Sequence, residues 1–262
     1  MSTSESTVLV TSENRVRTLT LNRPRKRNAL DAAAWESLGA ALRDFDQNEQ
    51  DRVLVITGAE GHFCSGTDVT TTQEPRHPLA EMRRVADVGV LLHRIEKPTI
   101  ALVRGHAAGA GCNLALACDL VVASTNAWFS EIFVRRGLSI DFGGSWMLPR
   151  LVGLHRAKEL ALLGDRVSSS EAAQLGLVNR ALPDDEVDEF AYDWATRLAD
   201  GPPVAMSLTK RLLNNAYSVT MEQALEDEGR AQAINAGTAD LAEGFKAFVD
   251  RRPPRFTGRS LV

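Results

Sequence analysis

The sequence predicts an α/β protein with a mainly parallel sheet, followed by a helical C-terminal region. Short apolar runs, typical of strands buried on both faces, alternate with helical stretches through the first half of the chain. Helical periodicity dominates after about residue 153. The 262 residues, of which 44% are apolar and 24% charged, have an ordinary globular composition. Because strands and helices alternate, we expect right-handed crossovers between parallel strands.

The N-terminal half contains short apolar runs separated by turns and helical segments. Strands are predicted at residues 8–10, 16–21, 53–57, 99–103 and 120–123. The first helix follows Asp31, which is a good N-cap residue. The apolar side chains after this cap recur at helical spacing: Trp35, Leu38, Leu42 and Phe45. Two further helices are expected at residues 79–95 and 113–117.

The C-terminal half is predicted to be almost entirely helical. Its helices are expected at residues 156–163, 170–175, 187–198, 204–217, 221–235 and 240–249. A Gly-Pro-Pro break at residues 201–203 divides the chain. We therefore expect an α/β core at residues 1–200 and a helical region at residues 201–262. The apolar faces of this helical region are too large for a solvated appendage, so we expect it to serve as a lid and an oligomer interface.

Charge and cysteine content exclude several classes of protein. The chain has 30 basic and 34 acidic residues, a net charge of −4, which argues against binding of nucleic acid. Its cysteines lack zinc-ligand spacing and are too few for a disulfide scaffold, so we expect reduced thiols and no metal: Cys64, Cys112 and Cys118. The longest apolar stretch, residues 114–123, is short and interrupted by Asp119. Without a signal-peptide pattern at the N-terminus, we expect a cytoplasmic protein without a membrane partner.

Two glycine-rich turns follow predicted buried strands. They cover residues 61–69 (GHFCSGTDV) and residues 105–113 (GHAAGAGCN). Small residues let the backbone turn sharply and let a ligand approach main-chain N–H groups, which could stabilise an oxyanion. The alternative is that these small residues only allow close packing, because glycines at strand-to-helix turns are common in α/β proteins. The second turn lacks the third glycine and the acidic residue of a dinucleotide-binding fingerprint.

Several motifs recur in an order and at a spacing that resemble the enoyl-CoA hydratase/isomerase (crotonase) superfamily. They are residues 21–30 (LNRPRKRNAL), 63–68 (FCSGTD), 97–98 (KP), 105–119, 137–153 and 243–248 (EGFKAF). This resemblance implies a crotonase-like spiral of ββα turns that carries the acyl-CoA site. It also implies a homotrimer, or a hexamer formed as a dimer of trimers. The coenzyme A thioester would be the substrate, and no separate cofactor is expected.

The resemblance also implies the roles of individual residues. The thioester oxygen would lie between the backbone N–H groups of Thr67 and Ala110. Coenzyme A would contact Arg25, the backbone near four further residues, and Arg251 of a neighbouring subunit. Those four residues are Ala29, Ser65, Asp68 and Val69. The basic cluster at residues 23–27 suits phosphate groups, although alone it is more typical of a solvated surface.

The hydratases that this chain resembles hold a water between two glutamates. The corresponding positions here are Asn113 and Phe133, so both carboxylates are missing. Glu131 is the nearest acid to the second position. Its two-residue offset leaves the direction of its side chain undetermined, and a loop or surface carboxylate is the simpler interpretation.

Asp141 lies where double-bond isomerases and aryl-CoA dehalogenases of the superfamily carry a catalytic aspartate. Its apolar neighbours Leu138, Ile140 and Phe142 would desolvate the carboxylate, raise its pKa and make it a better base. The alternative is that Asp141 only caps the helix expected to start near residues 143–146.

One base and an oxyanion hole suffice for isomerisation of an enoyl-CoA double bond, which is the predicted reaction. Asn113 would orient the substrate or a water. Residues 108–119 are most similar to the ring-1,2-epoxyphenylacetyl-CoA isomerase branch. An enoyl-CoA hydratase and a catalytically silent CoA-binding homologue remain alternatives, whereas a dehalogenase would need a histidine where this chain has Ala86. Residues 70–84 are expected to line the acyl pocket, and the acyl group itself stays open.

Overall fold

The computed structural model describes residues 6–70 and 77–259. At its centre lies a six-stranded sheet with the strand order β1-β2-β3-β4-β6-β9. β1 pairs antiparallel with β2, and the other neighbours are parallel. The strands are β1 (Val8–Glu13), β2 (Val16–Leu21), β3 (Val53–Gly58), β4 (Thr99–Val103), β6 (Leu120–Ser124) and β9 (Arg180–Leu182). The mainly parallel sheet that the apolar runs predict is confirmed.

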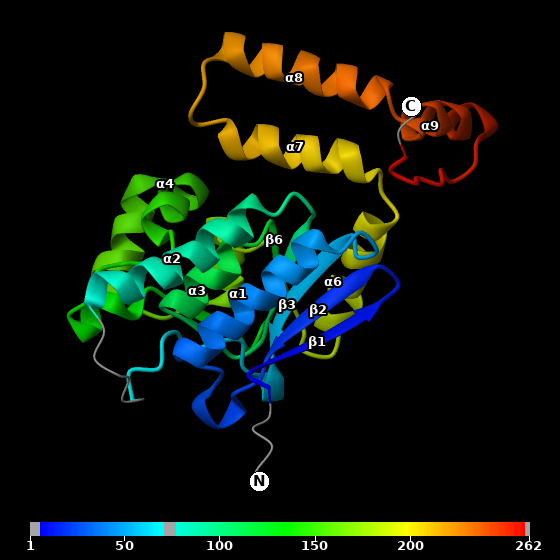
Figure 1. Cartoon of the computed structure of the whole chain (residues 1–262). Coiled ribbons are helices and arrows are strands. Elements are labelled where there is room, and N and C mark those ends of the chain that lie inside the picture. The colour runs from blue at the N-terminus through cyan, green and yellow to red at the C-terminus, as the bar shows by residue number, and fades with distance from the viewer. Residues whose placement is uncertain (1–5, 71–76, 260–262) are drawn as a thin grey trace.

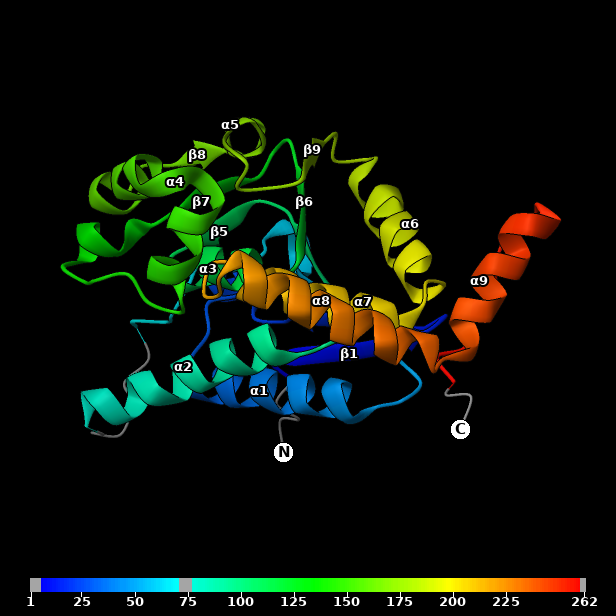
Figure 2. The ribbon, with the colours of Figure 1, turned by 90° about the horizontal axis from the view of Figure 1, so that it is seen from above.

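Helices cover both faces of this sheet, as Figures 1 and 2 show. Alternate residues of β3 divide between two cores: Leu54 packs in the cluster that contains α1, and Val55 in the cluster that contains α6. The covering helices are α1 (Ala32–Gln47), α2 (Pro78–Arg94), α3 (Ala110–Leu116) and α6 (Val187–Ala199). Burial on both faces explains why these strands are continuous apolar runs.

A second, three-stranded sheet lies beside the first. Its strands are β5 (His106–Ala108), β7 (Trp128–Ser130) and β8 (Val167–Ser168), in the order β5-β7-β8. The chain passes from β4 to β5, through α3, and then from β6 to β7, so successive turns contribute a strand to each sheet. This arrangement is the spiral of ββα turns. After β7, the chain forms α4 (Gly144–Leu163) and α5 (Ser169–Leu175).

The C-terminal region consists of α7 (Pro203–Asn215), α8 (Met221–Ala236) and α9 (Ala239–Asp250). α7 and α8 form a pair that crosses above the core, and α9 lies beyond them, farther from α4 (Figures 1 and 2). Lys210 of α7 fixes this pair to the core through Asp119 (2.7 Å) and the carbonyl of Lys97 (3.1 Å). Large apolar side chains of these helices, and of the turn between α7 and α8, stay exposed: Leu213, Tyr217, Met221, Leu225, Ile234, Phe245, Phe248 and Val249.

The predicted helices are all present, with shifted boundaries. α1 begins after Asp31, whose carboxylate accepts a hydrogen bond from Ala34 N (2.9 Å), as its cap role requires. The helix expected to start near residues 143–146 and the one expected at residues 156–163 form the single element α4, which Gly153 (φ 76°, ψ 161°) interrupts. The strands β5, β7, β8 and β9 have two or three residues each, too few for a sequence pattern. No helix in the described ranges has the length and apolar content needed to span a bilayer.

Candidate active site

The two glycine-rich turns lie directly against each other. Ala108 N donates to the Cys64 carbonyl (3.0 Å), which joins the second turn to the first. A Cβ on Gly111 would lie 2.4 Å from the Cys64 carbonyl oxygen, so only glycine fits there. Gly66 (φ +97°) of the first turn also lies close to the second turn. A Cβ on Gly66 would lie 2.8 Å from Ala108 O and 3.6 Å from Ala110 N. The glycines therefore bring two strand ends into backbone contact.

Each turn presents one backbone N–H group that has no backbone acceptor in the described part of the chain. Leu30 N donates to Gly66 O (2.8 Å) and Asp68 N donates to Leu30 O (2.9 Å), so the amide of Thr67 between them points away from Leu30. Ala110 is the first residue of α3, where helix N–H groups have no intrahelical acceptor. Within the described residues, neither the Thr67 nor the Ala110 amide donates a hydrogen bond to the backbone. Both donors are available to an oxyanion.

Asn113 connects α3 to the loop that precedes α4. Its side chain is fully buried, and Nδ2 donates to the carbonyl oxygen of Asp141 (3.0 Å) and to Oε2 of Glu131 (3.3 Å). The Asp141 carbonyl can only accept, so the NH₂ group of Asn113 must face it. Gly144 packs on this amide, because a Cβ there would lie 2.5 Å from Nδ2. Asn113 is thus held in one orientation.

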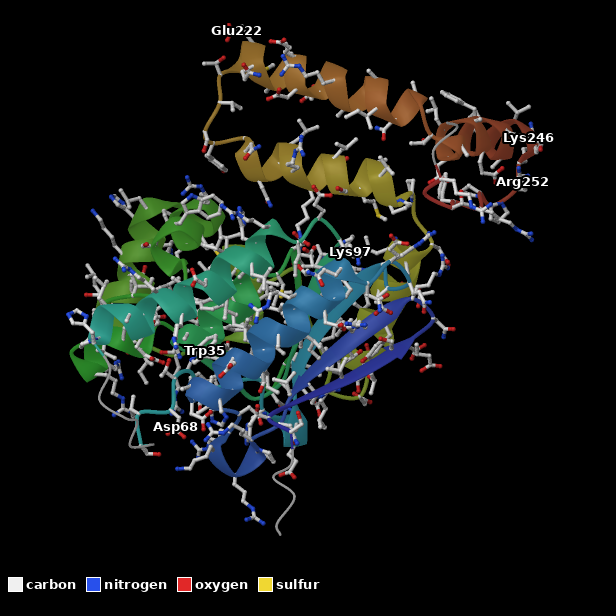
Figure 3. All side chains as sticks on the ribbon, in the orientation of Figure 1. Trp35, Asp68, Lys97, Glu222, Lys246 and Arg252 are labelled. Atoms are coloured by element: carbon white, nitrogen blue, oxygen red, sulfur yellow. The ribbon has the colours of Figure 1, made fainter. Side chains whose placement is uncertain are left out.

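The Asp141 carboxyl does not cap α4. The N-cap of this helix is Gly143, which has no side chain to offer, and the helix starts at Gly144. Asp141 Oδ1 is buried without a hydrogen-bond partner among the described residues, and burial raises the pKa of Asp141 to about 6. The next residue, Phe142, has a left-handed backbone (φ 48°) and stacks on Trp35 (5.3 Å), which Figure 3 labels. The cap alternative is therefore wrong.

Glu131 joins this cluster, which its sequence offset did not reveal. It lies directly after β7, is 3% exposed and points toward Asn113. Burial raises the pKa of Glu131 to about 7, and the charge of Asp141 adds to the shift. Phe133, at the second hydratase-type glutamate position, is buried and apolar. The site therefore contains an amide and two protonatable carboxyls: Asn113, Glu131 and Asp141.

The basic segment predicted to bind coenzyme A lies beside the first glycine-rich turn. Ser65 Oγ donates to the carbonyl of Lys26 (3.2 Å), and Lys26 Nζ donates to Thr70 Oγ1 (2.8 Å). Arg25 lies in the short 3₁₀ helix η1 (Pro24–Lys26) and is exposed. Val69 is 75% exposed. The structure brings all of these residues to one edge of the molecule.

Arg23 of this segment and Asp68 of the first turn have internal partners. Asp68 is buried, and its carboxylate forms an ion pair with Arg23 (3.0 Å). Arg23 also pairs with Asp31 (2.8 Å) and donates to the carbonyl of Ala29. Arg23 therefore braces the turn and is not free for a phosphate, unlike the exposed Arg25.

One predicted coenzyme A contact, Arg251, is not brought to this edge within one chain. Arg251 follows α9 with a left-handed backbone (φ 53°), and its neighbour Arg252 lies at the opposite end of the molecule from Asp68 (Figure 3). The resemblance assigns Arg251 to the site of a neighbouring subunit, and that role stays a prediction. Of residues 70–84, expected to line the acyl pocket, residues 71–76 lie outside the described residues.

Comparison with known proteins identifies the family. The sequence pattern of the enoyl-CoA hydratase/isomerase family matches residues 11–259. The chain belongs to this family. It is an enzyme of the hydratase/isomerase type with the crotonase fold.

Relatives within the hydratase/isomerase family have different names. A probable enoyl-CoA hydratase of Rhodobacter capsulatus is 39% identical over 92% of this chain and 94% of its own. The 1,2-epoxyphenylacetyl-CoA isomerase of Escherichia coli is 35% identical over 94% of this chain and 97% of its own. The crystal structure of a putative enoyl-CoA hydratase from Streptomyces coelicolor superposes with a TM-score of 0.91, at 37% identity, covering 99% of this chain and 97% of its own. The family is therefore shown, and the individual reaction must be argued from the site.

Proposed function

We propose that this protein is an enoyl-CoA isomerase that uses Asp141 as its single base. The observation that carries the proposal is the Asp141 carboxyl: its Oδ1 is buried without a hydrogen-bond partner among the described residues, and its main chain is tied to Asn113. The two hydratase-type glutamate positions hold Asn113 and Phe133, and neither can transfer a proton. A proton shift requires one carboxylate as the base and an oxyanion hole that stabilises the enolate.

The reaction proceeds in two proton transfers. The Asp141 carboxylate removes a proton from C2 of a 3-enoyl thioester, and the electron pair of that C–H bond moves onto the thioester oxygen as an enolate. The N–H groups of Thr67 and Ala110 donate to this oxygen. Protonated Asp141 then returns the proton to C4, which leaves the double bond between C2 and C3. Atoms and charge balance without a further reactant.

Coenzyme A binds along the edge formed by the basic segment and the first turn. Arg25 is exposed there and suited to a phosphate. Backbone groups near Ala29, Ser65, Asp68 and Val69 would contact the rest of the carrier. Asp68 supports this role indirectly, since its ion pair with Arg23 keeps the turn in place.

Hydration of a 2-enoyl-CoA is the second candidate. Oδ1 of Asn113 and Oδ1 of Asp141 are both buried without partners among the described residues, and together they could hold a water. An amide cannot act as an acid–base group, so we expect slow hydration. Conversion of a 3-enoyl-CoA to the conjugated thioester raises the ultraviolet absorbance, whereas hydration of crotonyl-CoA lowers it. Rapid loss of crotonyl-CoA absorbance, without conversion of the 3-enoyl thioester, would contradict the isomerase proposal.

The pKa of Asp141 predicts the acidic limb of the rate. Since the base must be ionised and its pKa is about 6, kcat/KM should fall about tenfold per pH unit below that value. An ordinary aspartate would keep its activity down to about pH 4. Initial rates with a 3-enoyl-CoA between pH 4.5 and 8 measure the limb. A constant rate down to pH 5 would show that Asp141 is not the base.

We also propose that the protein assembles as a homotrimer or a hexamer. The apolar side chains that α7, α8 and α9 leave exposed, among them Phe245 (67%) and Phe248 (83%), form more apolar surface than a lone chain usually leaves open. A neighbouring copy would cover them and bring its Arg251 toward the coenzyme. Light scattering at micromolar concentration should give three or six times the chain mass of 28.5 kDa. A monomer would contradict the proposal.

A further inference from the structure

Glu131 is a buried carboxyl that takes no part in the two proton transfers proposed above. It is 3% exposed, between β7 and the 3₁₀ helix η3 (Ile132–Arg136). Its Oε2 accepts a hydrogen bond from Asn113 Nδ2 at 3.3 Å, and the Cys112 thiol is a second hydrogen-bond partner of the carboxyl. Its Oε1 is buried with no hydrogen-bond partner among the described residues. Glu131 is the N-cap residue of η3, but its side chain makes no capping hydrogen bond to that helix.

These contacts suit a neutral acid better than a carboxylate. An ionised carboxylate needs several strong donors to replace its water, and here one long amide hydrogen bond and one weak thiol donor would have to suffice. The groups that face Glu131 are the Cys112 thiol and Asn113 amide on α3, and the Asp141 carboxyl before α4. Burial comes first among the causes that raise the pKa of Glu131 to about 7, above the value of about 6 for Asp141. Asp141 is the less buried of the two carboxyls, so it is the member of the pair that ionises first.

Asn113 links the Glu131 carboxyl to the main chain of the proposed base, Asp141. Its NH₂ group has two hydrogens, and the Glu131 carboxyl and the Asp141 main chain accept them. Glu131 therefore helps to hold the amide that fixes the Asp141 loop. Its charge matters as well, because an enolate forms beside Asp141. A second buried anion at that point would oppose both proton removal and the enolate charge.

We propose that Glu131 is a positioning residue that acts in its protonated, neutral form: it holds Asn113 against the main chain of Asp141 and leaves Asp141 the single negative charge of the pair. This inference rests on the proposed function, since it concerns the same base. It gives Glu131 no contact with the substrate and no proton to transfer.

The test compares the wild type with Glu131→Gln, which keeps the shape and the acceptor for Asn113 but cannot ionise. The wild type should lose kcat/KM both below about pH 6 and above about pH 7. Glu131→Gln should keep the acidic limb, lose the basic limb, and match the wild-type kcat near pH 6.5 within about threefold. Glu131→Ala should lower kcat about ten- to a hundredfold at every pH, because Asn113 loses its support. Glu36→Gln, at an exposed site on α1, is the control and should leave the profile unchanged.

Two results would overturn the inference. A basic limb that persists in Glu131→Gln would show that ionisation of Glu131 does not affect the base. A loss of activity at every pH in Glu131→Gln would show that Glu131 itself transfers a proton.

A measurement without substrate separates this inference from the proposed function. Burial favours the neutral form of Glu131 in the folded state, so the wild type should lose folding stability as the pH rises from about 4.5 to about 7. Glu131→Gln should lose less stability over this range, since only the raised pKa of Asp141 still contributes, and urea midpoints at several pH values report the difference. Equal pH dependence in both proteins would overturn the neutral form. Failure to convert a 3-enoyl-CoA, with the stability difference present, would instead count against the proposed function alone.

Discussion

Asp141→Asn is expected to lower kcat for isomerisation of a 3-enoyl-CoA about 10²- to 10⁴-fold. The substitution keeps the size of the side chain and the main-chain contact of Asp141 with Asn113 (3.0 Å). It removes the one group of the proposed mechanism that accepts the C2 proton. Stopped-flow or steady-state absorbance of the conjugated product measures the effect.

The same substitution should not weaken the fold. Burial raises the pKa of Asp141 to about 6, so its ionised form costs folding free energy once the pH exceeds the ordinary value of an aspartate. A neutral asparagine avoids this cost, and at pH 8 we expect equal or higher stability. Asp87→Asn, at an exposed position of α2, serves as the control. Full activity of Asp141→Asn would rule out the proposed base.

Ala110→Pro is expected to lower kcat at least about a hundredfold, the effect of losing one oxyanion-hole donor. Proline has no N–H group, and its ring carbon would occupy the direction in which the Ala110 amide points. Ala110 is the first residue of α3, a position where proline is tolerated because no intrahelical hydrogen bond is lost. The preceding Gly109 has no Cβ to clash with the ring. Ala110→Pro should therefore lose activity while the protein stays folded.

Ala110→Gly is the matched control for this experiment. It keeps the N–H group and removes only a buried methyl group, so kcat should stay within about fivefold of the wild type. Thermal unfolding of both variants checks that α3 remains in place. Comparable kcat for the proline and glycine variants would mean that the Ala110 amide does not hold the thioester oxygen.

Much of the fold was predictable because local patterns reflect its main physical constraints. The continuous apolar strands β3 and β4 have helices on both faces, and only a mainly parallel sheet buries strands in that way. Asp31 was recognisable as a cap because its carboxylate needs only the amide of Ala34, three residues away. The glycines of the two turns were recognisable as well, since close backbone approach excludes a Cβ.

The orientation of individual side chains was not predictable in the same way. Glu131 follows a three-residue strand whose register comes from pairing with β5, a contact between distant segments. The direction of its carboxyl therefore depends on where β5 and α3 lie, and its offset from Phe133 says nothing about it. Asp141 could equally have capped α4, and only the start of that helix at Gly144 decided against the cap.

The sequence by itself determined the fold class, the family, the paired glycine turns and the replacement of two family glutamates by Asn113 and Phe133. These features depend on residue type and on spacing along the chain, which a sequence states directly. Only the tertiary structure decided that Asn113, Glu131 and Asp141 form one buried cluster, and that Arg23 serves Asp68 and not a phosphate. Burial and hydrogen-bond partners arise from segments that folding brings together, and they set the charge of each group.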